Sequence, residues 1–420
     1  MTAYLTATEA AARLGVSRQT LYAYVSRGLI EAYPTADPRV RAYAAEAVAR
    51  LAEARRRSRR PREVARAALD WGLPVLETAV TLIRDGRLYY RGRDAVALAE
   101  TATLEEVAAR LWDLPLADAF GPDAPANPDA PSAPEAPLAP EAPLAPDAPL
   151  APDAPLAPDA PLAPDASARA SQGDLLGAFA ATTMDEPTAP WQQDPARLAA
   201  GSGALVRRLG ACITGIEPDG APLHRHCAAA WGLDPAGAEA VRQALVLCAD
   251  HELNASAFAA RCIASAGASL RAALVGGLAA LSGSRHGGMT DRVEALWDAL
   301  DEADPAASLR RQLAGREGLP GFGHPLYPAG DPRAAALMAP LLAQDPRLRA
   351  VTEAAEALTG ARPALDFALV ALRRHLGLAR GSAFGMFALG RSVGWIAQGL
   401  EQRRAGELIR PRAVYVGQEP

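Results

Sequence analysis

The chain contains no lysine, so all 43 of its basic side chains are arginine. Pyridoxal-phosphate and other Schiff-base enzymes need a nucleophilic lysine, and the Walker loop needs one on its phosphates. The sequence therefore excludes these enzyme classes. Aromatic residues make up only 5% of the chain, whereas 50% is hydrophobic and consists mainly of Ala, Leu and Val. Such a composition favours closely packed helices, so we predict an all-α fold.

The sequence also lacks the patterns of a membrane or secreted protein. No apolar run approaches the roughly 18 to 20 residues that a membrane-spanning helix needs. The N-terminal stretch MTAYLTATEAA does not show the charged and then apolar pattern of a signal peptide. We therefore expect a cytoplasmic protein with no membrane partner.

Cysteine is scarce, and its spacing argues against disulfides or zinc sites. The cysteines include no CxxC pair and lie in apolar stretches, so we expect buried thiols. A cluster at His224, His226 and Cys227 leaves a metal site open, but a polar surface turn is the favoured interpretation and we predict no metal. The four cysteines are Cys212, Cys227, Cys248 and Cys262.

Charge is distributed unevenly along the chain. Residues 1–68 hold thirteen Arg against six Asp and Glu, a net charge of +7, whereas the whole chain carries −5. The remaining residues therefore carry −12. A basic segment attached to an acidic body indicates two parts with different partners.

The basic segment has the pattern of two short helices separated by a turn. Thr6 and Glu9 have the spacing of a capping box at the start of a helical stretch that includes 10–14. Ser17 is placed to cap a second helix, RQTLYAYVSR, which Gly28 ends. The stretch AAARLGVSRQTLYAYVSRGLI resembles the helix-turn-helix of the MerR and excisionase families. The segment is therefore predicted to form a small winged helix-turn-helix module.

The resemblance implies that the second helix of this module enters a major groove of DNA. Arg and Gln on the outer face of that helix would reach base edges or phosphates. The alternative is a docking or dimerisation domain whose arginines are merely solvated. The module's core would consist of Leu14, Val16, Leu21 and Val25, and its DNA-facing residues would be Arg18, Gln19, Tyr22 and Arg27.

Residues 121–167 form a low-complexity segment dominated by APLAPD and APLAPE repeats, with an acidic residue every six positions from Glu135 to Asp165. Proline at every third position forbids helix and sheet, so we predict a disordered or polyproline-II-like acidic insertion. The composition on both sides is Ala- and Leu-rich with a helical pattern. The segment is therefore expected to be a loop inserted into one domain, without chemistry of its own.

Three histidines downstream of the insertion lie in small, Gly-rich contexts unlike ordinary helix faces. They are His251 in ADHELNAS, His286 in GSRHGG and His324 in GFGHPLYPAGDPR. Together with the Asp of RPALDFALV and the arginines of LGRSVGW and LIRPRAVYVG, these motifs resemble citrate synthase in order and spacing. The likeness begins at DGRLYYRGRDAVALAETATLEEVAARLW (85–112) and covers about 76–417 apart from the insertion.

The resemblance implies three catalytic residues. Asp366 matches the base that takes a proton from the carbon next to a thioester. His286 matches the histidine that hydrogen-bonds the thioester oxygen, and His324 matches the one that polarises and protonates the ketone of a 2-oxo acid. The chemistry needs all three, because a thioester α-carbon is a very weak acid and its enol oxygen must be stabilised by a donor.

The resemblance also implies how the dianionic 2-oxo acid is bound. Buried carboxylates need charged partners, and guanidinium groups can bind them through two hydrogen bonds. In the family, the last arginine reaches the active site of the neighbouring subunit, which implies a homodimer with shared sites. The matching substrate-binding residues are His251, Arg333, Arg391 and Arg410.

The family resemblance implies citrate-synthase-like large and small helical domains in residues 76–120 and 168–417. The small domain, about 287–364, would close over the oxo acid and exclude water. The implied reaction is acetyl-CoA plus oxaloacetate plus water to citrate and CoA, as in the tricarboxylic acid cycle. The coenzyme A thioester is then a substrate, no permanently bound cofactor is expected, and the CoA-contacting residues are unassigned.

Three alternatives stay open. Propionyl-CoA would give 2-methylcitrate, and one methylene is worth only about 1 to 3 kcal/mol of discrimination. The family commonly has Ala-Asn after the HGG motif and a basic or small residue after the loop histidine, whereas this chain has Met289-Thr290 and Pro325. The chain could instead be a DNA-binding regulator whose body senses a metabolite, but a sensor needs arginines and not a carbon base. In the third alternative the N-terminal module only mediates assembly.

Overall fold

The computed structural model describes most of the chain outside the basic segment and the Pro-rich repeat. Its Cα positions divide the chain into two compact units, Met1–Glu77 and Thr78–Pro420. The predicted insertion lies outside the described residues except for Gly121. The described residues are 4–14, 16, 18–26, 30–34, 41–49, 76–121, 172–183, 186–301, 304–314, 318–413 and 415–418.

The N-terminal unit contains a pair of short helices and a three-stranded sheet. Its elements are β1 (Tyr4–Thr6), α1 (Ala7–Leu14), α2 (Arg18–Ser26), β2 (Tyr33–Pro34) and β3 (Arg41–Ala44). The strands are antiparallel in the order β1-β3-β2. This arrangement agrees with the predicted winged helix-turn-helix module.

Local hydrogen bonds and a small core explain why this unit folds as it does. The Thr6 N–H donates to Glu9 Oε2 at 2.8 Å and the Glu9 N–H donates to Thr6 Oγ1 at 3.3 Å, so the predicted capping box is confirmed. The predicted core is also confirmed, since two of its members are buried and two are partly buried against them. The buried residues are Ala10, Ala11, Leu14, Leu21, Ile30, Tyr43 and Val48, and Val16 and Val25 pack against them.

The described residues of the second unit are mostly helical, so the predicted fold class is confirmed. Its first helices are α5 (Ala95–Thr101), α6 (Leu104–Trp112), α7 (Leu116–Phe120), α8 (Gln172–Ala180), the short 3₁₀ helix η2 (Glu186–Thr188), α9 (Pro195–Thr214), α10 (Leu223–Ala230), α11 (Pro235–Cys248), α12 (Ala255–Ser265) and α13 (Leu270–Leu281). The later helices are α14 (Met289–Asp298), α15 (Pro305–Leu313), α16 (Pro332–Gln344), α17 (Pro346–Thr359), α18 (Leu365–His375) and α19 (Ser382–Ala405).

A small antiparallel sheet at the start of this unit was not predicted. Its strands are β4 (Thr81–Arg84), β5 (Arg87–Tyr90) and β6 (Arg93–Asp94), in the order β4-β5-β6. Asp85 and Gly86 connect the first two strands with φ values of 53° and 71°. Positive φ at both central residues is typical of a hairpin turn, and Asp-Gly is its usual sequence. That dipeptide was the signal for the hairpin.

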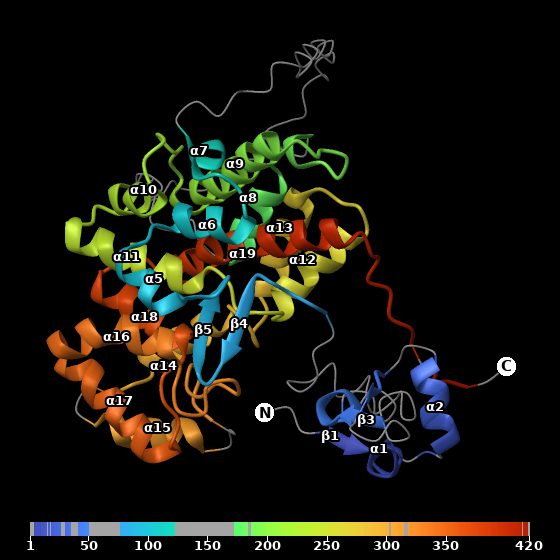
Figure 1. Ribbon diagram of the computed structural model, residues 1–420. Helices are drawn as coiled ribbons and strands as arrows, with labels where there is room; N and C mark the ends of the chain where they lie inside the picture. The colour runs from blue at the N-terminus through green and yellow to red at the C-terminus, as the bar shows by residue number, and fades with distance from the viewer. Residues whose placement is uncertain are drawn as a thin grey trace, which may run out of the picture. The chain divides into compact units, whose positions relative to one another are not determined.

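Helix α19 runs through the centre of the second unit and packs against α6, α11, α12 and α13 (Figure 1). Every residue from Ser382 to Leu400 is buried. Glycines let neighbouring backbone approach closely. A Cβ on Gly394 would lie 2.3 Å from the carbonyl oxygen of Ala249, just beyond the end of α11. The close approach fixes the segment that leads into His251.

We expect Gly394→Ala to destabilise the protein, because its methyl group would overlap the Ala249 carbonyl oxygen. Overpacking of this kind costs about 1–3 kcal/mol or more. Gly177→Ala is the matched control, since no described atom lies within 4 Å of a Cβ built on this helical glycine. It should be neutral or slightly stabilising. Thermal unfolding measures both variants, and equal melting temperatures would contradict this description of the α19 packing.

Two further sequence expectations concern cysteines and membranes. All four cysteines are free thiols; Cys227 and Cys248 are buried, as predicted, whereas Cys212 and Cys262 are only half-buried. Within the described parts of the chain, no helix combines the length and apolarity that a bilayer crossing requires.

Candidate active site

The three histidines in Gly-rich contexts and Asp366 come from separate parts of the second unit. His251 follows α11, His286 precedes α14, His324 lies in the loop before α16, and Asp366 is in the first turn of α18. The positive charge of the buried Arg333 acts on the pKa of all four groups. The fold therefore brings all four groups within electrostatic range of this guanidinium.

His251, His324 and Tyr327 form a close cluster of rings. The centroids of the two histidine rings are 5.1 Å apart, and the Tyr327 hydroxyl lies 2.9 Å from His251 Nε2. The Leu326 N–H donates to His324 Nδ1 at 3.2 Å, which leaves the proton of a neutral ring on Nε2. Burial, followed by the charge of Arg333, lowers the pKa of His251 well below its usual value and that of His324 to about 4. Both rings are therefore neutral near pH 7.

A glycine loop connects the region of His324 to that of Asp366. The Gly323 N–H donates to the Arg362 carbonyl oxygen and the Ala364 N–H donates to the Gly321 carbonyl oxygen, both at 2.8 Å. Both glycines have φ of 78°, which other residues rarely adopt. The two segments pair like a short bridge, so the loop is held against the start of α18.

Asp366 has the environment of a base. Its Oδ1 atom is buried and has no hydrogen-bond partner among the described residues. Burial raises the pKa of Asp366 to about 7, although the charge of Arg333 opposes the shift. A carboxyl group that titrates near neutral pH and keeps an unpaired oxygen can accept a proton from a substrate.

His286 is fixed by the first residues of α12. Its Nε2 lies 2.8 Å from Ser256 Oγ and 3.2 Å from Asn254 Oδ1. The Trp395 Nε1–H from α19 donates to the same Ser256 oxygen at 3.0 Å. Burial, helped by the charges of two arginines, lowers the pKa of His286 to about 3, so its ring is also neutral.

Arg333 is paired with Asp331 through two of its guanidinium nitrogens. Its Nε donates to Asp331 Oδ1 at 2.9 Å and its Nη2 donates to Oδ2 at 2.7 Å, in a buried two-bond pair. The Leu365 N–H at the start of α18 donates to the same Oδ2 at 3.2 Å. Although burial alone would raise it, the pKa of Asp331 is lowered by Arg333, so the carboxylate stays charged.

Arg391 has donors to spare, whereas Arg410 lies away from the cluster. The Arg391 Nε donates to the Cys248 carbonyl oxygen at 2.7 Å, but its buried Nη1 has no partner among the described residues. Arg391 is only 1% exposed, and burial lowers its pKa. Arg410 is exposed and donates to the Pro411 carbonyl oxygen. Within the described chain, no contact joins Arg410 to the other predicted site residues.

Sequence reasoning missed the residues that orient the predicted ones. Ser256 and Asn254 contact His286, Tyr327 contacts His251, and Asp331 holds Arg333. All four lie within the ADHELNAS and GFGHPLYPAGDPR motifs that the histidines had marked. Polar residues in those motifs were the available signal.

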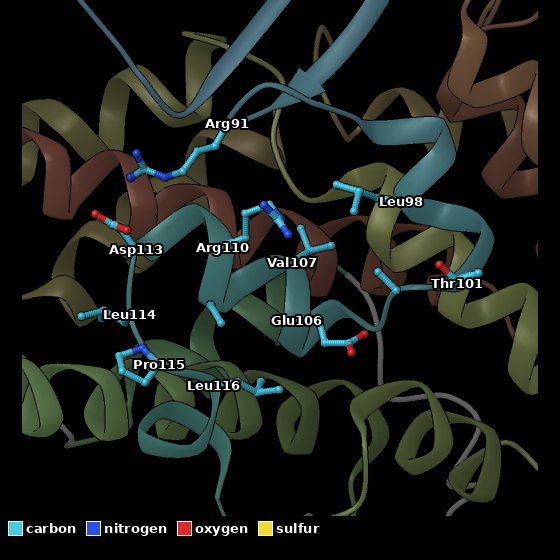
Figure 2. Close-up of a pocket in the computed structure, with 12 residues that line it drawn as sticks. Arg91, Leu98, Thr101, Glu106, Val107, Arg110, Asp113, Leu114, Pro115 and Leu116 are labelled. Carbon is cyan, nitrogen blue, oxygen red and sulfur yellow. The ribbon is translucent and has the colours of Figure 1, made fainter.

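Two cavities in the described part of the chain differ in their relation to this site. One, of about 940 Å³, lies beside α5 and α6 and contains none of the predicted site residues (Figure 2). The other, of about 790 Å³, is lined by Met289 and Arg292 of α14, Leu296 and the segment 318–320. Met289 is three residues after His286, and 318–320 leads into the loop of His324. None of the predicted site residues lines the second cavity either, but its lining residues are close to His286 and His324 in the sequence.

The predicted DNA-facing residues are only partly described. Arg18 and Gln19 begin α2, and the Tyr22 side chain is 53% exposed on the same helix. Arg27, Ser17 and Gly28 lie outside the described residues.

The favoured interpretation of His224, His226 and Cys227 as a polar surface turn was wrong, because all three are buried in helix α10. The alternative, a metal site, is not supported by their contacts. His226 Nε2 lies 2.9 Å from Thr214 Oγ1, and the pKa of Cys227 is raised by burial to about 12. In the portions of the chain that are described, no group of three or more His, Cys, Asp or Glu side chains is arranged to hold a metal ion.

Comparison with known families identifies both parts of the chain. The family model for the citrate synthase C-terminal domain matches residues 162–412, more than half of the chain. The chain belongs to the citrate synthase family. A helix-turn-helix domain model matches residues 4–56, in agreement with the predicted N-terminal module.

Relatives within the citrate synthase family carry more than one activity in their names. A citrate synthase-like protein of Mycobacterium tuberculosis is 40% identical over 207 residues, 44% of this chain and 53% of that protein. A 2-methylcitrate synthase of Shewanella oneidensis is 36% identical over 186 residues, 42% of this chain and 50% of that protein. The chain thus spans about half the length of the curated relatives it matches.

Solved citrate synthases share the fold. The structure of the Thermoplasma acidophilum citrate synthase, determined with carboxymethyl coenzyme A and oxaloacetate, has a TM-score of 0.62 at 22% identity. The match covers 83% of this chain and 95% of that one.

Proposed function

We propose that this protein condenses an acyl-CoA thioester with oxaloacetate, and that acetyl-CoA gives citrate and CoA. The observation that carries the proposal is the buried, unpaired carboxyl oxygen of Asp366, which shares the electrostatic influence of Arg333 with three neutral histidines, together with the buried Arg391 and its unpaired Nη1. A site that only bound a dianion would need the arginines but not a base for carbon.

In the first step Asp366 takes a proton from the carbon next to the thioester carbonyl, and the enol oxygen receives a hydrogen bond from His286. The Ser256 hydroxyl donates to Asn254 Oδ1 at 2.7 Å and lies 2.8 Å from His286 Nε2. We propose that substrate binding turns the hydroxyl onto Nε2, which places the proton of a neutral His286 on Nδ1. We propose that this Nδ1–H donates a hydrogen bond to the thioester oxygen. Removing one donor of this kind typically lowers the rate by a factor of about 10² to 10³.

In the second step the enol carbon attacks the ketone of oxaloacetate, and His324 delivers a proton to the ketone oxygen from Nε2. His324 then regains a proton from water and Asp366 loses its own to water, which restores both groups. Arg391, Arg333 and His251 hold the two carboxylates. Arg391 contributes its unpaired Nη1, whereas Arg333 first has to share or release Asp331. Water then hydrolyses the citryl thioester and releases CoA with a free thiol.

The cavity beside Met289 and Arg292 fits the position of the CoA portion in this proposal. A thioester held between His286 and Asp366 would extend toward α14, and the Arg292 guanidinium can pair with a phosphate there. Small-domain closure of about 287–364 would then cover the reacting atoms, within a body made of 76–120 and 168–417.

We expect kcat/KM for the thioester to rise with pH through about 7 and then level off. Asp366 must be deprotonated to act as the base, and its pKa is raised by burial to about 7. The pKa values of His286 and His324 are lowered to about 3 and 4, so neither ring titrates in this range. A profile of kcat/KM from pH 5.5 to 9 measures the effect. A kcat/KM that stays flat or falls between pH 6 and 8 would remove Asp366 from this role.

An experiment can distinguish acetyl-CoA from propionyl-CoA as the preferred substrate. Propionyl-CoA is the second candidate, since relatives named 2-methylcitrate synthase match the chain at 35–36% identity. We expect both thioesters to react, with acetyl-CoA preferred. An assay with both thioesters present, with citrate and 2-methylcitrate separated by mass spectrometry, measures the preference. An excess of 2-methylcitrate would assign the enzyme to propionyl-CoA.

We also propose a homodimer in which Arg410 enters the active site of the other subunit. Its exposed position on the extended segment after α19 leaves it available to a second copy. Mixing inactive Arg410→Ala subunits with inactive Asp366→Asn subunits should restore part of the activity if sites are shared.

For the N-terminal module we propose DNA binding through α2. Duplex binding by the full chain should weaken steeply as salt rises, because each neutralised phosphate releases counterions. Replacing Arg18 and Arg27 by alanine should weaken it further at every salt concentration. A fluorescence titration of duplex at several salt concentrations measures both effects. If no duplex from a random pool binds, the module is an assembly domain.

A further inference from the structure

A buried charge cluster joins the helix that follows His286 to the helix that carries Asp366. On α14, Glu294 is only 4% exposed. Its Oε1 accepts a 2.8 Å hydrogen bond from Arg373 Nε on α18, and its Oε2 accepts a second from Arg373 Nη2. The Arg373 guanidinium also donates from Nη1 to the Leu378 carbonyl oxygen at 3.0 Å. The pair is therefore held from both helices and from the turn after α18.

A second set of charged side chains lies next to this pair and is partly exposed to solvent. Arg374 Nη1 lies 3.4 Å from Glu294 Oε2 and 3.5 Å from Asp298 Oδ1. Asp298, one turn further along α14, also pairs with Arg380. The side chains of Asp298 and Arg380 are 50% and 61% exposed, so the outer pair is screened by water.

Stability alone does not explain the inner pair. Two desolvated charges seldom stabilise a protein more than apolar residues of the same size, although removing one partner is costly. Apolar contact between these helices already exists, since the rings of Trp297 on α14 and Phe367 on α18 are stacked with centroids 5.7 Å apart. Stacked rings tolerate small shifts along the helix, whereas a two-bond ion pair permits one register.

The position of the ion pair links the register of α14 on α18 to the geometry of the candidate active site. His286 lies three residues before α14, and Asp366 lies in the first turn of α18. Arg373 is seven residues after Asp366, about 10 Å along the helix axis. Because the His286 ring is also held by Asn254 and Ser256, a shift of α14 on α18 strains the short segment between His286 and Met289 and displaces the imidazole relative to Asp366. A misplacement of about 1 Å between reacting groups can cost 10²-fold in rate.

We propose that Glu294 and Arg373 are positioning residues, which hold α14, the part of the small domain that packs on α18, in one register, so that the domain closes with His286 and Asp366 facing the same thioester. The assignment rests on the proposed condensation function. Neither residue touches the reacting atoms, and both act through the helices that bear the catalytic side chains.

The test replaces the inner pair by an apolar one of similar length, Glu294→Met with Arg373→Met. We expect its melting temperature to stay near that of the wild type, because no buried charge is left unpaired. The kcat value should fall at least about tenfold while KM for oxaloacetate changes little. Asp298→Asn, on the same helix and in the exposed outer pair, is the matched control and should keep wild-type kcat. If the Met pair does not fold, Glu294→Leu with Arg373→Met, which likewise leaves no buried charge unpaired, should show the same loss.

Wild-type kcat in the double variant would overturn the proposal, and so would a loss of kcat that only follows a loss of melting temperature. Amide hydrogen exchange of residues 289–298 gives a second readout, since α14 should exchange faster without the inner pair. If the wild type condenses neither thioester, the proposed function fails. The amide hydrogen exchange of residues 289–298 then tests by itself whether the ion pair fixes α14. Unchanged exchange would then overturn the positioning role.

Discussion

We expect Asp366→Asn to lower turnover by several orders of magnitude while the fold and oxaloacetate binding persist. Asparagine fills the same volume but cannot accept a proton from carbon, and no other described carboxyl group combines a pKa raised to about 7 with a place among the three histidines. Removing a positioned base typically costs about 10² to 10⁴-fold, and the weak acidity of the thioester favours the upper end. Release of CoA thiol under saturating substrates measures the effect.

The same variant should be at least as stable as the wild type at pH 8. Burial raises the pKa of Asp366 in the folded state from 3.8 to about 7, so its contribution to stability is present at low pH and is lost as pH rises through about 7. The asparagine side chain of the variant does not titrate, so the melting temperature of the variant should not show that loss. An Asp366→Asn protein with near-normal turnover would remove this residue from the mechanism.

The second large effect is expected for Arg391→Gln. Arg391 is buried and has an unpaired Nη1, so in the proposed function it would pair with a carboxylate of oxaloacetate. Truncating one partner of a buried charge pair costs about 2–5 kcal/mol, which is about 30-fold or more in affinity. We expect KM for oxaloacetate to rise by at least that factor.

Arg403→Gln is the matched control for this variant. Arg403 lies on the same helix and is half-buried, but it donates to the carbonyl oxygens of Thr188 and Ala268 and not to the site. Oxaloacetate should raise the melting temperature of the wild type and of Arg403→Gln, because a ligand that binds only the folded state stabilises it. A similar rise in Arg391→Gln would show that Arg391 does not bind the oxo acid.

The sequence predicted the helical fold class and the N-terminal module because their signals are local. The Thr6–Glu9 capping box and the apolar spacing of Leu14 and Leu21 act within a few residues. The small sheet was missed because the composition argument averages over the chain, whereas Asp85-Gly86 sets a hairpin by itself.

The candidate site was predictable in its residue types but not in its hydrogen bonds. Family resemblance pointed to Arg333 as a carboxylate ligand, yet its guanidinium is taken by Asp331 two residues away. The pairing depends on how the turn before α16 folds, which no spacing rule specifies. Likewise, the contact of Glu294 with Arg373 joins residues 79 positions apart, and sequence periodicity carries no signal for it.

The most direct test of the central claim is the release of CoA thiol from acetyl-CoA by the purified full-length protein. The wild type and Asp366→Asn are measured side by side, with and without oxaloacetate. We predict thiol release by the wild type that requires oxaloacetate, and almost none by the variant. Equal release from both proteins, or no release by a folded wild type that binds oxaloacetate with either acetyl-CoA or propionyl-CoA, would contradict the assignment of this site to acyl-CoA condensation.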